Sequence, residues 1–96
     1  MGNAVFNEAK NGGRHNGMYK QLTGQTDDEL VKSVRSFEEN VKEHASKINS
    51  PSDFIHDWDS RNEQYKVGII KKWQKDLTRN EELAAVALGV IKERGQ

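Results

Sequence analysis

The sequence predicts an all-α domain of about four helices, with two long antiparallel helices and short N-terminal helices packed across them. Two long segments carry apolar residues at steps of three and four, the spacing of one helix face. The chain has a single proline, Pro51, so little interrupts a helix. No segment shows the alternation and β-branched residues of a strand. Ninety-six residues form one domain, and we expect it to span residues 1–96.

The N-terminal quarter predicts two short helices. Residues 3–10 can form the first, with their apolar side chains on one side. Glycines 12 and 13 then favour a turn. Residues 18–22 can add one or two further helical turns, which end at Gly24.

The first long helix is predicted from Asp27 to Ile48. Thr26 is a suitable N-cap, and Glu29 stands at capping-box spacing from it. Apolar residues recur from Leu30 onward at helical spacing. The helix is expected to end before Pro51.

A connector and a second long helix are predicted for the remainder of the chain. Residues 52–58 carry aromatic and apolar side chains that can dock on the core. Ser60 and Glu63 have capping-box spacing, so a helix is expected from about Ser60 to Lys92. Residues 78–81 repeat that spacing, so a break or kink near Asn80 remains an alternative.

Charge is balanced overall but distributed unevenly. The formal net charge is zero, with 15 basic and 15 acidic residues. Residues 27–59 hold four basic and nine acidic residues, and residues 60–96 hold eight basic and five acidic. Nucleic-acid binders are usually basic, because contacts to phosphates supply most of their affinity. A nucleic-acid substrate would therefore require one basic face or a partner protein. No apolar run is long enough to span a membrane, so no membrane partner is expected.

Arg14 and His15 are the leading catalytic candidates. Acid–base chemistry at a phosphate needs a base, an acid and a cation near the anion, and histidine and arginine suit these tasks. Both residues lie in a loop flanked by Gly12, Gly13 and Gly17, where backbone amides could approach a phosphate. The alternative is a polar turn that contains an incidental histidine.

The other two histidines are weaker candidates. His44 falls on the apolar stripe of the first long helix, where it is either a core histidine or a second catalytic group. His56 lies among aspartates in the connector, but the pattern lacks the glycine and ligand ladder of an EF-hand. We therefore expect no metal site and no cofactor.

A basic segment of the last helix predicts substrate contacts. Lys72, Lys75 and Arg79 are three and four residues apart and share one helix face. They form either a stripe that follows phosphates or an ordinary solvated surface. Tyr19 and Trp58 could stack on bases. Trp73 falls in the apolar stripe and is expected in the core.

The order of these motifs resembles a family of bacterial toxins. The matching pieces cover most of the chain from Gly12 onward. They are Gly12-Gly13-Arg14-His15-x-Gly17, Val34-Arg35-Ser36-Phe37-Glu38-Glu39 with His44 and Ile48, Asn49-Ser50-Pro51, Trp58, and Trp73-Gln74-Lys75-Asp76 before an apolar final helix. In this order they are similar to the C-terminal ribonuclease domains of contact-dependent growth-inhibition and other polymorphic toxin proteins.

The resemblance implies a helical, metal-independent endoribonuclease that cleaves tRNA. Such a domain is delivered as part of a larger secreted or cell-surface protein and acts in the cytoplasm of a competitor. The family also implies a cognate immunity protein and, for some relatives, elongation factor Tu. His15 would then be the general acid or base, Arg14 the phosphate ligand and His44 a second proton carrier, with Gly13, Tyr19, Lys72 and Lys75 binding substrate. The alternatives are a non-catalytic helical protein-binding module and a helical DNA binder.

Overall fold

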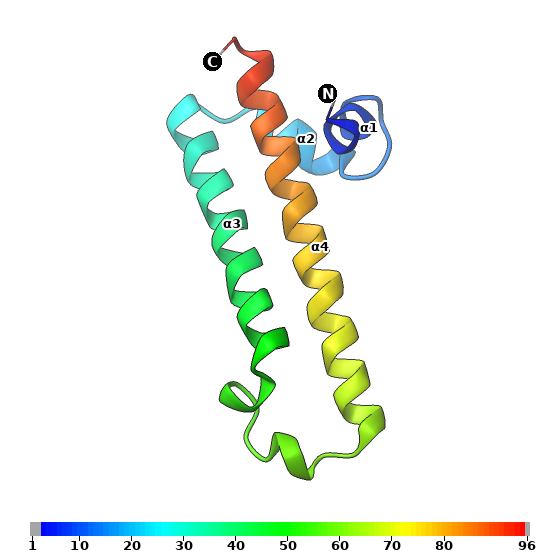
Figure 1. The fold of residues 1–96 in the computed structure, drawn as a ribbon. Helices are drawn as coiled ribbons and strands as arrows, with labels where there is room; N and C mark the ends of the chain where they lie inside the picture. The colour runs from blue at the N-terminus through cyan, green and yellow to red at the C-terminus, as the bar shows by residue number, and fades with distance from the viewer. Residues whose placement is uncertain (1–2, 96) are drawn as a thin grey trace.

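The computed structural model describes residues 3–95, and within this range the chain is all-α, as predicted. It contains four α-helices and two short 3-10 helices (Figure 1). Their bounds are α1 Ala4–Lys10, α2 Asn16–Thr23, α3 Asp27–Asn49, η1 Pro51–Asp53, η2 Trp58–Ser60 and α4 Glu63–Glu93. No helix in this part of the chain combines the length and apolarity needed to cross a membrane.

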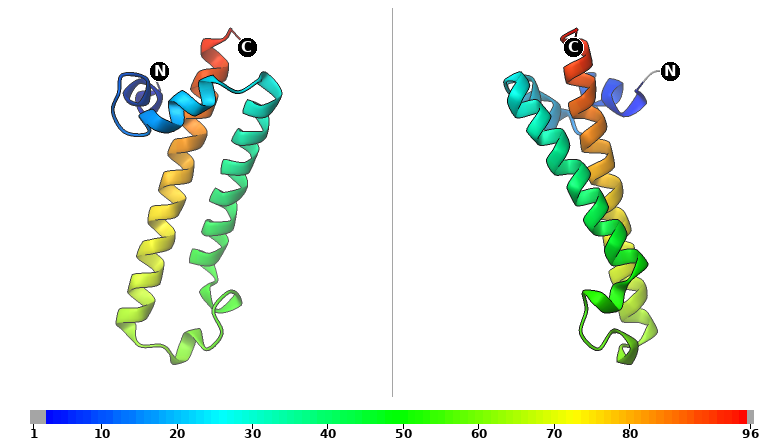
Figure 2. Two further views of the ribbon diagram at one scale, coloured as in Figure 1. Left: turned by 180° about the vertical axis from the view of Figure 1, so that it is seen from behind. Right: turned by 60° about the vertical axis from the view of Figure 1, so that its left-hand side comes forward.

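Helices α3 and α4 form a long antiparallel hairpin, which η1 and η2 close at one end (Figure 1). Helices α1 and α2 lie beside the C-terminal half of α4, and α1 lies on the side away from α3 (Figure 2). The molecule is therefore elongated, with extents of 51 × 25 × 24 Å. One half contains four helices, whereas the other contains only the hairpin and its connection.

The helix termini follow the capping signals in part. Thr26 and Glu29 form the predicted capping box of α3. The predicted cap of α4 is wrong, because Asn62 and not Ser60 accepts the bond from the backbone N–H of Tyr65. Helix α2 also begins at Asn16, two residues earlier than expected.

Helix α4 passes through Asn80 without a break. The Asn80 side-chain amide donates to the carbonyl of Asp76 one turn earlier, at 2.9 Å. Its side-chain oxygen accepts from Asn40 of α3 at 3.3 Å. Asn80 thus joins the two long helices, and the repeated capping spacing at residues 78–81 does not start a new helix.

The hydrophobic core lies where the four helices meet. Leu22, Leu30, Val86 and Val90 are almost completely buried there. Together they bring α2, α3 and α4 around a common centre. At the other end, the buried residue Trp73 stacks on Trp58 with ring centroids 6.2 Å apart, which confirms that Trp73 is packed inside.

Helix α1 approaches the backbone of α4 at Gly89. A Cβ atom at this position would lie 2.8 Å from Phe6 Cβ and closer still to the phenyl ring. Asn3 strengthens the same contact, because its side chain accepts from Phe6 N and donates to the Ala85 carbonyl. The missing side chain at Gly89 therefore allows α1 to pack directly on α4.

Candidate functional site

Arg14 and His15 meet Glu82, which lies 67 positions after His15 in the chain. His15 Nε2 lies 2.8 Å from Glu82 Oε1, and Arg14 Nε lies 2.9 Å from the same oxygen. The two candidates come from the loop between α1 and α2, whereas Glu82 projects from α4. The structure thus brings the two leading candidates together on one carboxylate.

The three side chains differ in exposure. The His15 side chain is 10% exposed, that of Glu82 24%, and that of Arg14 59%. The imidazole of His15 is therefore mostly buried, while the guanidinium of Arg14 extends into solvent. An Nη group of Arg14 can contact a ligand while Nε stays on Glu82, because guanidinium has five N–H donors.

The loop has its shape because α1 ends in a glycine turn. Gly12 has a φ of +92°, a left-handed conformation that costs glycine little. The N–H of Gly12 donates to the Ala9 carbonyl and that of Gly13 to the Glu8 carbonyl, as in a Schellman motif. This turn directs Arg14 and His15 toward α4.

The same turn argues against the expected phosphate cradle at Gly13. Its N–H already bonds to the Glu8 carbonyl at 2.8 Å. The Arg14 N–H faces the Glu8 carboxylate at 3.3 Å, and an added Gly13 Cβ would lie 2.6 Å from Glu8 Cγ. These amides are occupied and a carboxylate lies beside them, so Gly13 serves the turn.

His15 itself adopts a left-handed backbone conformation, with φ 68° and ψ 17°. It stands at the N-cap position of α2 without making a side-chain cap. Histidine is one of the residues that tolerates this region better than most. The conformation places the imidazole on Glu82 instead of on the first turn of α2.

Glu82 is held as a carboxylate. Its pKa is lowered from the usual value by the hydrogen bond from His15 first and by that from Arg14 second. A carboxylate accepts hydrogen bonds, so the imidazole proton on this side belongs to His15 Nε2. In a neutral imidazole the other nitrogen, Nδ1, is then the basic one. No group within residues 3–95 hydrogen-bonds to Nδ1.

His44 is not part of this cluster. Its Nδ1 donates to the Asn40 carbonyl at 2.7 Å within α3, and its Nε2 lies 3.7 Å from Asp76. Asp76 lies six residues before Glu82, about 9 Å along α4, and on a different face of the helix. The geometry therefore gives His44 a packing role and separates it from His15.

The two expected stacking residues are half-buried in aromatic contacts. Tyr19 packs edge-on against Phe6, with centroids 5.8 Å apart. Trp58 stacks on Trp73, and Lys66 Nζ lies 5.9 Å from the Trp58 ring. Each ring therefore has at least one protein partner, and the backbone N–H of Tyr19 donates to the His15 carbonyl at 2.9 Å.

The His56 side chain is 96% exposed, and its Nε2 lies 3.3 Å from Asp57 Oδ1. Within residues 3–95, no three His, Asp or Glu side chains gather in a way that could hold a metal ion.

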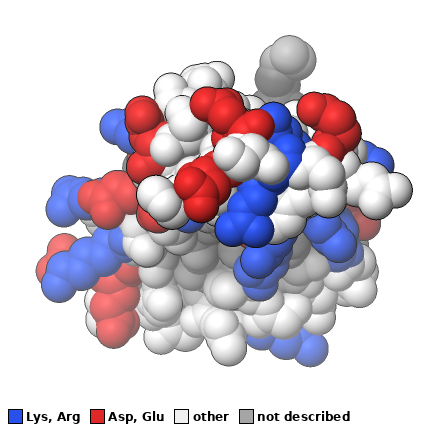
Figure 3. Space-filling model, turned by 90° about the horizontal axis from the view of Figure 1, so that it is seen from below, with Lys and Arg blue, Asp and Glu red and all other residues white. Residues whose placement is uncertain are grey.

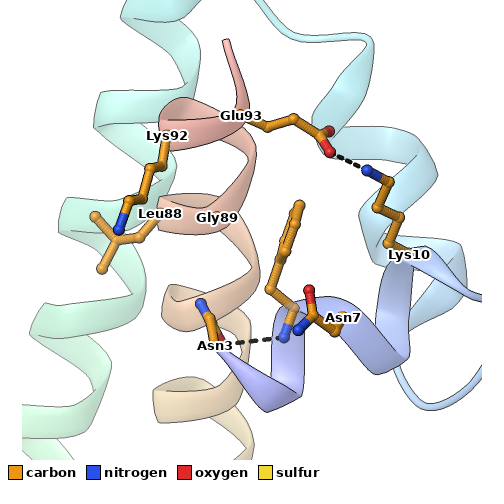
Figure 4. A pocket seen from close by; sticks show the side chains of 8 residues that line it. Asn3, Asn7, Lys10, Leu88, Gly89, Lys92 and Glu93 are labelled. Carbon is orange, nitrogen blue, oxygen red and sulfur yellow. Dashed lines mark hydrogen bonds and ion pairs between the residues drawn. The ribbon is translucent and has the colours of Figure 1, made fainter. Parts of the chain in front are cut away.

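A pocket of about 430 Å³ lies between α1 and the end of α4 (Figure 4). Asn3, Asn7 and Leu88 contribute to its lining, and the Lys10–Glu93 ion pair spans one edge. None of Arg14, His15 and Glu82 lines it. The pocket is thus a feature of the α1–α4 contact and is separate from the histidine cluster.

Glu82 was not predicted as a site residue. Its only signal in the sequence is its place directly before Leu83 and four residues before Val86, both of which are buried. Comparison of the chain with known proteins finds no matching family model, no similar curated protein and no similar solved structure. The chemistry of the site must therefore be argued from the side chains themselves.

Proposed function

We propose that this domain is a metal-independent endoribonuclease toxin that cleaves tRNA. The observation that supports it is the His15–Glu82–Arg14 cluster, which combines a proton carrier, an orienting carboxylate and a cation. The sequence resemblance described above supplies the tRNA substrate and the toxin role. The cluster supplies the chemistry.

The proposed reaction is internal transesterification. His15 Nδ1 takes the proton of a ribose 2′-hydroxyl, and the 2′-oxygen attacks the adjacent phosphorus. The bond from phosphorus to the 5′-oxygen breaks, and that oxygen takes a proton from the imidazolium or from water. The products are a 2′,3′-cyclic phosphate and a 5′-hydroxyl, so no water is consumed.

Each partner of His15 has a defined task. Glu82 holds the imidazole through Nε2 and stabilises the imidazolium that forms when Nδ1 accepts the proton. Arg14 presents its Nη groups to the non-bridging oxygens, where negative charge develops. His44 has no task in this scheme, because its two nitrogens face Asn40 and Asp76.

The proposal extends to partners. A toxin of this kind requires a cognate immunity protein in the producing cell, and elongation factor Tu could present the tRNA. The zero net charge is compatible with such assistance, because the domain has no general basic surplus. Delivery within a larger secreted or surface protein, and action in the target cytoplasm, belong to the same proposal.

The test is cleavage of total bacterial tRNA by wild-type protein and by His15→Asn. Asparagine tolerates the left-handed conformation at position 15, so the loop is retained while the imidazole is lost. We expect cleavage in EDTA and a loss of about 10²- to 10⁴-fold in the variant. Reactions with and without cytosolic extract show whether a host factor is required. Undiminished cleavage by folded His15→Asn would refute the assigned base.

A second candidate is a protein-binding module, and one surface favours it. Leu88 is 47% exposed and lines a groove of about 590 Å³ between α3 and α4. Val31, also 47% exposed, lines a smaller groove of about 260 Å³ that Leu88 shares. Val41 and Ala84 lie in the lining of the larger groove. If the protein cleaves no tRNA, either alone or together with cytosolic extract, the larger groove becomes the preferred functional surface.

A further inference from the structure

Three cations form a row on one face of α4. Lys72, Lys75 and Arg79 are all exposed and follow one another at steps of three and four residues. The next step of three reaches Glu82, so the row leads along the same face to the His15 cluster. The distance from Lys72 to Glu82 is about 15 Å along the helix axis.

These cations are not neutralised within the described chain. Across residues 3–95, none of the three has a carboxylate within ion-pair distance, whereas Lys10, Arg14 and Arg94 each do. Asp76, the acidic residue next to Lys75, lies near His44 of α3. The row is therefore a local surplus of positive charge in a protein of zero net charge.

The row lies on the part of α4 that the short helices leave uncovered. Helices α1 and α2 lie beside the C-terminal half of α4, whereas the other half faces only α3 and its connection (Figures 1 and 2). Seen from the connected end, Lys and Arg side chains lie in the centre of this face as well as at its edges, while Asp and Glu lie mostly across its upper half and along its left edge (Figure 3). An elongated ligand could thus follow α4 without obstruction.

We propose that this row binds the phosphates of a single RNA strand and leads the strand into the His15 cluster. The choice of RNA rests on the proposed ribonuclease function. Arg14, which is more than half exposed, would continue the row at the cleaved phosphate. The length of the row corresponds to a few nucleotides of an extended strand.

A single strand suits the row better than a duplex. One line of cations contacts one phosphate backbone, whereas a duplex presents two backbones across a groove. The expected preference is therefore single-stranded RNA over duplex.

Two triple variants test the row in the His15→Asn background, which separates binding from cleavage. The first replaces Lys72, Lys75 and Arg79 with glutamine. The matched control replaces Lys32, Arg35 and Lys42, three exposed cations of α3, also with glutamine. Both triples change the net charge equally, so a general charge effect cancels. The probe is a fluorescein-labelled oligouridylate of about twelve nucleotides, followed by anisotropy over a range of salt concentrations.

Loss of the α4 row is expected to weaken binding at least tenfold at low salt. Each phosphate contact on a single strand contributes about −0.7 to the slope of log K against log salt, so the slope should flatten by about 2. The α3 control should retain the parent slope. The proposal would be overturned if the two triple variants lost RNA affinity equally or if the parent bound a matched duplex more tightly than the single strand. It would also be overturned if the parent bound no RNA.

Cleavage assays distinguish this inference from the ribonuclease proposal. In the otherwise wild-type protein, the α4 triple should raise KM more than it lowers kcat, since the row positions RNA and does not touch the reacting atoms. Cleavage with an unchanged kcat/KM would refute the row and leave the ribonuclease intact. Salt-dependent RNA binding through the row without cleavage would refute the ribonuclease and leave the row.

Discussion

The imidazole Nε2 of His15 lies 2.8 Å from Glu82 Oε1, so one hydrogen bond joins the α1–α2 loop to the middle of α4. Arg14 binds the same oxygen from the same loop. The carboxylate therefore orients both candidate groups at once. The arrangement depends on the packing of α1 against Gly89, because α1 carries the loop that holds both residues.

Glu82→Gln is expected to impair cleavage while the fold is retained. The amide can still accept a bond from His15, but it carries no charge to stabilise the imidazolium. We expect kcat to fall by between about 10-fold and 10⁴-fold with little change in KM, by analogy with other carboxylate–histidine pairs. Single-turnover cleavage by wild type and variant measures it. An unchanged kcat would show that the His15–Glu82 pair is a structural contact only.

The same substitution should alter how stability depends on pH. The pKa of Glu82 is lowered in the folded state, so its carboxylate stabilises the fold above the unfolded pKa, near 4.5. That contribution is lost as pH falls through the lower, folded-state pKa. Wild type should therefore exceed Glu82→Gln in Tm at neutral pH, and the difference should shrink below about pH 4.5. A difference that is constant with pH would argue that Glu82 is not held as a carboxylate by its partners.

Backbone strain at His15 gives a prediction that does not depend on activity. The φ of 68° disfavours alanine more than glycine, by about 1 kcal/mol. Both His15→Ala and His15→Gly lose the bond to Glu82, so their difference isolates the backbone. Urea denaturation should find the glycine variant more stable by about that amount. Equal stability would show that the left-handed conformation relaxes when the imidazole is removed.

The fold could be predicted because its signals are local. Helix α3 carries a capping box at Thr26 and an apolar repeat, and both signals lie within one segment. The start of α4 was misplaced because Ser60 and Asn62 are both good caps, and only the turn made by η2 decides between them. Asn80 likewise could be judged only once its partner Asn40 was known.

The site could be predicted only in part, because its third member is distant in sequence. Arg14 and His15 were found from loop composition and resemblance, which are local signals. The position of Glu82 beside the loop depends on how α1 packs on α4, and the spacing of apolar residues in the sequence does not predict that contact. The part that Gly13 plays in the turn was missed for the same reason, since its N–H bonds to the Glu8 carbonyl and the neighbouring Arg14 N–H faces the Glu8 carboxylate.

His44→Gln is expected to lower stability without abolishing cleavage. His44 bonds to the Asn40 carbonyl and faces Asp76, so its loss removes a contact between the long helices and should cost about 1 kcal/mol. Its separation from His15 predicts a kcat within about threefold of wild type, because a lost proton carrier would cost 10²-fold or more. Urea denaturation and single-turnover cleavage measure the two effects. A large fall in kcat in the folded variant would restore His44 as a second proton carrier.

Two glycines of α4 should respond in opposite directions to alanine. Gly68 is exposed, with no atom within 4 Å of an added Cβ, so Gly68→Ala should stabilise the protein by about 0.5–1 kcal/mol through helix propensity. Gly89→Ala gains the same propensity but forces Phe6 away from α4, a clash that costs about 1–3 kcal/mol. Urea midpoints at constant slope compare the two variants directly. Because α1 leads into the Arg14–His15 loop, Gly89→Ala should also reduce cleavage, whereas Gly68→Ala should not. A stabilised Gly89→Ala would contradict the close packing of α1 on α4, and with it the geometry that brings His15 to Glu82.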